Sequence, residues 1–287
     1  MKNRTVERVL YAELVDMGSM PVRQPFPTQQ VAQIDPFLLL HHHITPLPEG
    51  VIPHKTGVDP HPHRGFSPVT FVYQGGVHHR DSRGNNSVVY AGGTQWMNAG
   101  RGIIHSERPP QDIMAQGGVQ EIVQLWINTP AAHKMDQPAY MAVHAADTPE
   151  YHVEGVQVKV VAGEYQGIKG AVKTYSSLLV LRVELEANAQ HRFLLPQEYN
   201  AFLYLLHGGI QVTGFGLVEG LHQVIFNNDG DGVTVTANEK TQLLLLAGTP
   251  LKEPLAMNGP FVMNTETELM QAMRDYRMGK MGILIED

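Results

Sequence analysis

The sequence predicts an all-β protein made of two antiparallel barrels and ending in a short helix. Three observations lead to this fold class: apolar runs that recur between turn residues, a similar strand, turn and strand pattern in both halves, and helical periodicity confined to one late segment. At 287 residues, the chain is long enough for two domains of ordinary size, each with its own core.

The apolar runs are short and carry β-branched and aromatic residues, with Gly, Pro and Asn between them. This spacing is typical of antiparallel sandwiches and barrels. The runs cover residues 67–73, 86–90, 121–127, 157–162, 177–184, 201–206, 209–213, 232–237 and 242–247.

The two halves of the chain resemble each other. Residues 201–213 (AFLYLLHGGIQVT) and residues 69–79 (VTFVYQGGVHH) both read as a strand, a Gly-Gly turn and a second strand, which favours a duplicated barrel. Residues 129–154 are rich in Pro, Ala and polar residues without a clear period, so we expect a linker there. The predicted domains are therefore residues 1–135 and 136–287.

One segment has a clear helical pattern, at residues 265–278. Thr265 is the expected N-cap, and Glu268 three residues later completes a capping box. Gly279 is the expected end of the helix.

The composition disfavours several classes of protein. The net charge is -7 and no block of Lys or Arg could bind a phosphate backbone, so we expect no direct nucleic-acid partner. No signal-peptide segment and no apolar run near ~20 residues is present, so we expect a cytoplasmic protein without a membrane span. With no Cys, any metal site must use His and carboxylate ligands.

Two tripeptides predict the functional site: His61-Pro62-His63 and His105-Ser106-Glu107. Residues i and i+2 of a strand point to the same face, so two neighbouring strands would present three imidazoles and one carboxylate. This set suits Fe(II), Mn(II), Co(II), Ni(II), Cu(II) or Zn(II), with coordination positions left for water, dioxygen or a chelating substrate. A lone HxH is commonly surface or core histidine, and the second pair is what favours a metal.

Glycines and arginines surround these pairs. Gly100-Arg101-Gly102 predicts a tight turn ahead of His105, and Gly75-Gly76 predicts a hairpin turn. Arg64 and Arg101 either hold carboxylates behind the ligands or face solvent.

Residues 59–109 closely resemble the pirin family of the cupin superfamily, and the likeness extends over nearly the whole chain. The motifs that carry it are HPHRGF at 61–66, QWMNAGRGIIHSE at 95–107, TPLKEPLAMNGPFVMNTETELMQA at 249–272, DPFLLL at 35–40 and EYQGIKG at 164–170.

The resemblance implies a bicupin, with two antiparallel jelly-roll barrels and a metal only in the N-terminal one. Residues that match the family's ligands are His61, His63, His105 and Glu107, and we expect Fe(II) as the metal. The region around residues 190–192 contains no HxH, so the C-terminal barrel is expected to be structural. Many members behave as monomers, so a monomer is expected.

One motif departs from the family. Many relatives have one or two acidic residues after the DPFLLL run, whereas this chain has His41-His42-His43. The main interpretation is a set of exposed histidines in a loop, and the alternative is extra contacts to metal or substrate.

Some pirins open a flavonol ring with dioxygen, so we expect a metal-dependent dioxygenase of quercetinase type with a flavonol-like substrate. Glu107 would be both ligand and the base that accepts the flavonol 3-hydroxyl proton. The alternative function is a metal- or redox-responsive regulator that binds a transcription factor or metabolic enzyme, as the resemblance to eukaryotic pirins implies. A binding or storage barrel without a reaction is a third interpretation.

Overall fold

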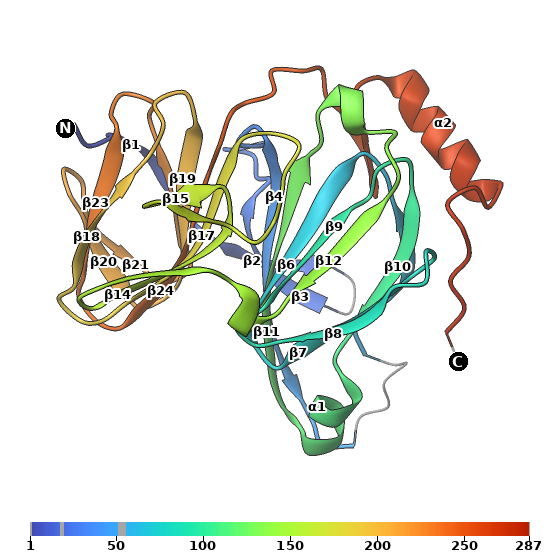
Figure 1. The fold of residues 1–287 in the computed structure, drawn as a ribbon, viewed down its shortest axis with the longest axis horizontal. Coiled ribbons are helices and arrows are strands. Elements are labelled where there is room, and N and C mark those ends of the chain that lie inside the picture. The colour runs from blue at the N-terminus through green and yellow to red at the C-terminus, as the bar shows by residue number, and fades with distance from the viewer. Residues whose placement is uncertain (1, 18–19, 51–55, 287) are drawn as a thin grey trace. The chain divides into compact units, whose positions relative to one another are not determined.

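The computed structural model describes residues 2–17, 20–50 and 56–286 (Figure 1). The chain forms two compact units, both built from antiparallel sheets, which confirms the all-β prediction. One unit takes residues 16–22, 37–146 and those from 252 on, and the other takes the residues up to 15, 23–36 and 147–251. Among the described residues, no helix has the length and apolar character that a membrane crossing requires.

The unit that contains the predicted site is a barrel of two sheets. A seven-stranded sheet has the order β12-β9-β6-β11-β4-β3-β2, and a four-stranded sheet has the order β5-β10-β7-β8. The strands of the larger sheet are β2 (Glu13–Met17), β3 (Met20–Phe26), β4 (Phe37–Leu47), β6 (Phe66–Gln74), β9 (Thr94–Asn98), β11 (Gly118–Asn128) and β12 (Ala139–Val143). Those of the smaller sheet are β5 (Val58–His63), β7 (Gly76–Asp81), β8 (Asn86–Tyr90) and β10 (Ile103–Arg108).

Two helices and a hairpin complete this unit. Helix α1 (Gln111–Gln116) precedes β11, and α2 (Glu266–Arg277) follows the hairpin of β25 (Ala256–Asn258) and β26 (Phe261–Met263). The apolar face of α2 packs on this hairpin, which buries Leu269 and Ala272 against Phe261 and Met263. The capping box between Thr265 and Glu268 is present as predicted.

The other unit repeats the two-sheet barrel. Its larger sheet consists of β1 (Val6–Tyr11), β13 (Glu150–Val153), β14 (Val156–Ala162), β17 (Leu178–Leu185), β19 (Asn200–His207), β22 (His222–Phe226) and β24 (Thr241–Gly248). Its smaller sheet consists of β18 (Gln190–Leu194), β20 (Gly209–Val212), β21 (Gly216–Glu219) and β23 (Gly232–Ala237), and a short pair comprises β15 (Glu164–Tyr165) and β16 (Ile168–Lys169). Alternate residues of these strands, such as Leu243, Leu245 and Ala247 of β24, fill a continuous aliphatic core.

Residues 129–154 differ from the linker that the sequence predicted. The chain passes from one unit to the other at residues 146–147, within this segment, but the segment also contains β12, which pairs with β9, and β13, which pairs with β14, so the expected lack of regular structure was wrong. The missing periodicity has a physical reason, because both strands lie at a sheet edge and bury few side chains. The sequence contains no sign of the terminal segments that the two units exchange.

Candidate metal centre

Strands β5 and β10 position the three predicted imidazoles. The two strands pair antiparallel, with His105 opposite His61 and Ile103 opposite His63. Since side chains alternate along a strand, this register directs all three rings to the barrel interior. One donor nitrogen from each ring lies within 4.8 Å of the others, which is the spacing that a single metal ion needs.

The three rings differ in exposure. Their centroids are 4.3 Å apart for His61 and His105, 4.7 Å for His61 and His63, and 5.0 Å for His63 and His105. His63 and His105 are buried, whereas His61 is partly exposed. The cluster therefore has a closed side and an open side.

Hydrogen bonds select the nitrogen that each ring offers. Nδ1 of His61 donates to the Asp59 carbonyl oxygen at 2.8 Å, and Nδ1 of His63 donates to the Pro260 carbonyl oxygen at 3.4 Å. A carbonyl only accepts, so both rings keep their lone pair on Nε2. Nε2 of His105 is buried and has no hydrogen-bond partner among the described residues. A buried imidazole nitrogen without a hydrogen-bond partner, beside two nitrogens that carry lone pairs, fits the donor set of a metal site.

The buried rings are held in the neutral form that binds metals. Burial lowers the pKa of His105 well below its usual value, and the neighbouring His61, His63 and His79 lower it further. Burial, followed by the charge of His61, also lowers the pKa of His63 against the effect of its Pro260 hydrogen bond. Neutral imidazoles need to release no proton when a cation arrives.

Glu107 lies beside this group and is not part of the three-nitrogen cluster. The pairing of β10 with β5 shifts register between His105 and Glu107, and three side chains donate to the Glu107 carboxylate. Oε1 accepts from Thr70 at 3.0 Å and from Gln95, and Oε2 accepts from Gln124 at 2.8 Å. A carboxylate has about four acceptor positions, so one position remains on Oε2.

A cavity opens next to His61 and Glu107. It is lined by Val22, His41, His43, Gly57, Val58, His61, Val77, Glu107, Gln120, Ile122 and Gln124. Four aliphatic side chains share this wall with three imidazoles, two amides and the Glu107 carboxylate, so the cavity offers both apolar surface and polar groups to a small molecule.

The expectation of exposed loop histidines at residues 41–43 was wrong. All three residues lie within β4, and His41 and His43 line the cavity. Burial lowers the pKa of His41 to about 4, so the ring is neutral at neutral pH. His42 is buried on the other face of β4, where its Nε2 lies 2.9 Å from Oε1 of Glu121.

The two arginines of the motif have different roles. Arg64 is buried and forms an ion pair with Asp275 of α2. The side chain of Arg101 is exposed, while its backbone carbonyl accepts from Nε of Arg64 at 2.7 Å. Both therefore support the loop next to His63 without contacting the imidazole cluster.

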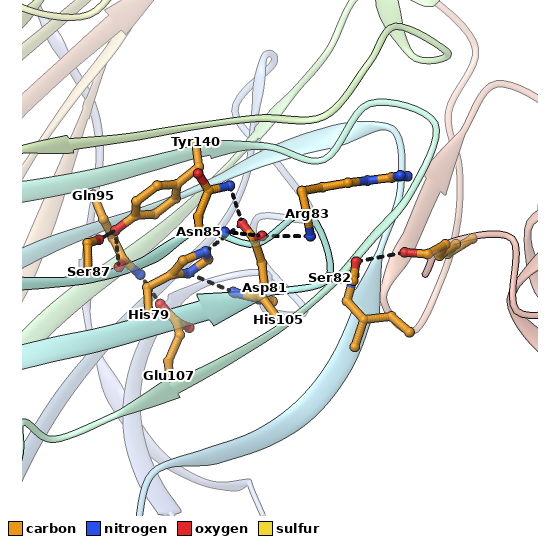
Figure 2. Close-up of polar contacts among 12 residues, drawn as sticks. His79, Asp81, Ser82, Arg83, Asn85, Ser87, Gln95, His105, Glu107 and Tyr140 are labelled. Carbon is orange, nitrogen blue, oxygen red and sulfur yellow. Dashed lines mark hydrogen bonds and ion pairs between the residues drawn. The ribbon is translucent and has the colours of Figure 1, made fainter. Parts of the chain in front are cut away.

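Sequence reasoning missed the residues behind the cluster. Figure 2 shows His79 of β7 between Asp81 and His105, with the ring of Tyr140 stacked on it and Gln95 reaching Glu107. The signal was available, because His79-Arg80-Asp81 has the same i, i+2 spacing as the two predicted pairs.

Similarity to known proteins covers nearly the whole chain. The family profile described as pirin matches residues 19–127, and that of the pirin C-terminal cupin domain matches residues 180–282. A pirin-like protein of Arabidopsis thaliana is 36% identical, with 98% of this chain and 86% of the relative covered. A Pseudomonas aeruginosa protein that is named provisionally as a quercetin 2,3-dioxygenase is 37% identical, with 91% of each chain covered.

Solved structures agree in fold. The crystal structure of a quercetin 2,3-dioxygenase from Acinetobacter baumannii superposes with a TM-score of 0.93 at 34% identity, over 99% of this chain and 100% of that one. A bacterial pirin from Escherichia coli, crystallised with nickel(II), has a TM-score of 0.68 at 20% identity over 85% and 99% of the two chains. The double barrel is thus a bicupin, and the chain belongs to the pirin family.

Proposed function

We propose that this protein is a metal-dependent dioxygenase that opens the ring of a flavonol such as quercetin with dioxygen and releases carbon monoxide. The observation that carries the proposal is the convergence of three imidazole nitrogens beside a cavity of mixed apolar and polar lining. Its similarity to the A. baumannii and P. aeruginosa proteins that carry the name quercetin 2,3-dioxygenase supports the same activity.

His61, His63 and His105 would hold the metal, with Glu107 as the fourth ligand, and we propose Fe(II) as the native ion. When bound, the metal supplies Lewis acidity that lowers the pKa of a coordinated flavonol hydroxyl and leaves positions for dioxygen. The donor set fits, because Nε2 of His61 and of His63 carries a lone pair and Nε2 of His105 has no other partner among the described residues.

Glu107 is the proposed base. Thr70 and Gln95 anchor Oε1, which leaves Oε2 with one acceptor position on the side of the cavity-lining Gln124. When Glu107 loosens from the metal, this position on Oε2 becomes free to accept the 3-hydroxyl proton.

The cavity wall would orient the rings of the substrate. Val22, Val58 and Ile122 offer apolar surface for a flat aromatic ligand, and Gln120 and His41 offer polar groups to its hydroxyls.

The test is anaerobic mixing of metal-loaded protein with quercetin, followed by dioxygen. Carbon monoxide release with loss of flavonol absorbance is the expected result. Absence of turnover with each of iron, manganese, cobalt, nickel and copper would overturn the proposal.

One observation favours a second candidate, a metal-responsive regulator that binds a protein partner. Strand β10 carries His105 and Glu107 inward and Ser106 and Arg108 toward the C-terminal segment, where both donate to Glu286. A shift of His105 or Glu107 on a change of metal state would therefore pass along β10 to the segment around Glu286. A pull-down whose yield is the same for ferrous, ferric and metal-free protein would contradict this function, since a switch requires differential affinity.

A further inference from the structure

The strand on the other side of β10 carries a third pair of buried polar residues. Strand β7 pairs with β10, with Asp81 opposite His105 and His79 opposite Glu107. His79 has no exposed surface and Asp81 is 4% exposed. Buried polar groups nearly always have hydrogen-bond partners, so the partners of His79 and Asp81 indicate which ring nitrogens carry protons.

The Asp81 carboxylate is firmly fixed. Oδ1 accepts from the backbone amides of Arg83 at 2.8 Å and Asn85 at 3.1 Å, and Oδ2 accepts from the Asn85 side chain at 2.7 Å. Oδ2 also lies 3.0 Å from Nε2 of His79. Because a carboxylate only accepts, the proton of His79 is on Nε2 and its Nδ1 keeps the lone pair.

This assignment determines the tautomer of His105. Nδ1 of His105 lies 3.4 Å from Nδ1 of His79, and one of the two must donate. Since the lone pair is on His79, the proton is on Nδ1 of His105. Its Nε2 then carries the lone pair that points into the imidazole cluster.

Tyr140 of β12 packs against the ring of His79. Its phenol ring stacks on the imidazole of His79, with centroids 3.9 Å apart and an interplanar angle of 8°. Its hydroxyl bonds Ser87 at 2.8 Å and reaches Oε1 of Gln95 at 3.4 Å, and the Gln95 amide donates to Glu107. The hydrogen-bond chains behind His105 and Glu107 therefore meet at one aromatic ring.

We infer that His79 and Asp81 are positioning residues, which fix the tautomer and ring orientation of His105 before a metal arrives. The inference rests on the proposed metal site. Hydrogen-bonded partners behind a ligating imidazole commonly change metal affinity by about 10- to 100-fold.

Asp81→Asn provides the sharpest test, because Oδ1 can keep both backbone hydrogen bonds while Nδ2 replaces the oxygen that faces His79. The Asn85 side-chain amide, which donates to the same oxygen in the wild type, can turn its own oxygen toward Nδ2. The amide donates to His79 Nε2, which moves the His79 proton to Nδ1 and the His105 proton to Nε2. In the Ser-His-Asp triad the same exchange leaves the geometry intact and produces the wrong tautomer.

Two measurements test the change of His105 tautomer without an activity assay. Long-range ¹H–¹⁵N spectra of metal-free protein should show His105 protonated on Nδ1 in the wild type and on Nε2 in Asp81→Asn. Titration with Co(II) should show affinity about 10- to 100-fold weaker in the variant. An unchanged His105 tautomer or unchanged Co(II) affinity in Asp81→Asn would overturn the inference.

His79→Phe keeps the stacking on Tyr140, removes both ring nitrogens, and remains informative if Asp81→Asn does not fold. A similar loss of Co(II) affinity is expected, and wild-type affinity would overturn the inference. The matched control is His78→Asn, the neighbour on β7 that bonds Asn86 instead, which should bind Co(II) like the wild type. Tight Co(II) binding, together with no flavonol turnover for any of iron, manganese, cobalt, nickel and copper, would overturn the dioxygenase proposal and leave the positioning role intact.

Discussion

Arg64 Nη1 lies 3.1 Å from Oδ2 of Asp275, and both side chains are at most 9% exposed. Arg64 directly follows His63, and Asp275 lies on α2, so this ion pair ties the end of β5 to the C-terminal helix. The first prediction concerns its contribution to stability.

Asp275→Asn should lower the free energy of unfolding at pH 7 by about 1–3 kcal/mol, because it leaves the Arg64 guanidinium buried without its counterion. Urea denaturation measures the change. Asp136→Asn is the control: it alters an ion pair with His133 in which both side chains are 42% exposed, so an effect within about 0.5 kcal/mol is expected.

The same variant should show a defined pH dependence. Hydrogen bonds from Gln271, Lys280 and Arg64 lower the pKa of Asp275 against the effect of burial. A lowered folded-state pKa stabilises the fold above the unfolded pKa of about 4, and the contribution is lost as the pH falls through the folded value. The difference between wild type and Asp275→Asn should therefore shrink below about pH 4, and a difference that stays constant down to pH 2 would count against the assignment.

Much of the barrel could be predicted from the sequence, because the central strands bury nearly every side chain and so read as apolar runs. Strands β17 and β24 are clear examples. Edge strands such as β12 and β13 were not predicted, because they bury few side chains and so show no apolar run. The exchange of terminal segments between the units escaped prediction because no local pattern encodes which barrel a strand or helix joins.

The candidate site also has a part that could be predicted from the sequence and a part that could not. The i, i+2 rule brought His61, His63 and His105 together, because it depends only on strand geometry. It could not predict that Glu107 would be engaged by Gln95 and other donors, because those contacts depend on how separate strands meet.

His105→Ala should reduce the metal content of protein purified without added metal. It removes a ligand nitrogen, so the loss of affinity should exceed the roughly 10- to 100-fold expected for a supporting residue. Elemental analysis measures the change, and His133→Ala, an exposed histidine outside the cluster, is the control. Undiminished metal in His105→Ala would show that the cluster is not the site.

Glu107→Gln should retain most of the bound metal, because three imidazoles remain, and should lose flavonol turnover by roughly 10²- to 10⁴-fold through loss of the base. Carbon monoxide release per bound metal is the measurement. Turnover within threefold of wild type at equal metal content would rule out the proposed proton transfer.

His41→Ala should weaken anaerobic flavonol binding by about 1 kcal/mol, since it removes a polar group from the cavity wall. Fluorescence titration of metal-loaded protein with quercetin measures the dissociation constant. The control is His152→Ala, an exposed histidine of the other unit that bonds Glu150. Equal affinities for all three proteins would place the ligand elsewhere.

The Pro260 carbonyl that orients His63 comes from a segment made almost two hundred residues after the imidazole itself. A ribosome completes the first barrel's strands long before it delivers this backbone group and the helix that follows. Binding of a metal by the full pocket would therefore be a late event in biosynthesis. A nascent chain stalled before residue 252 would contain all three histidines, with His63 lacking its Pro260 hydrogen bond.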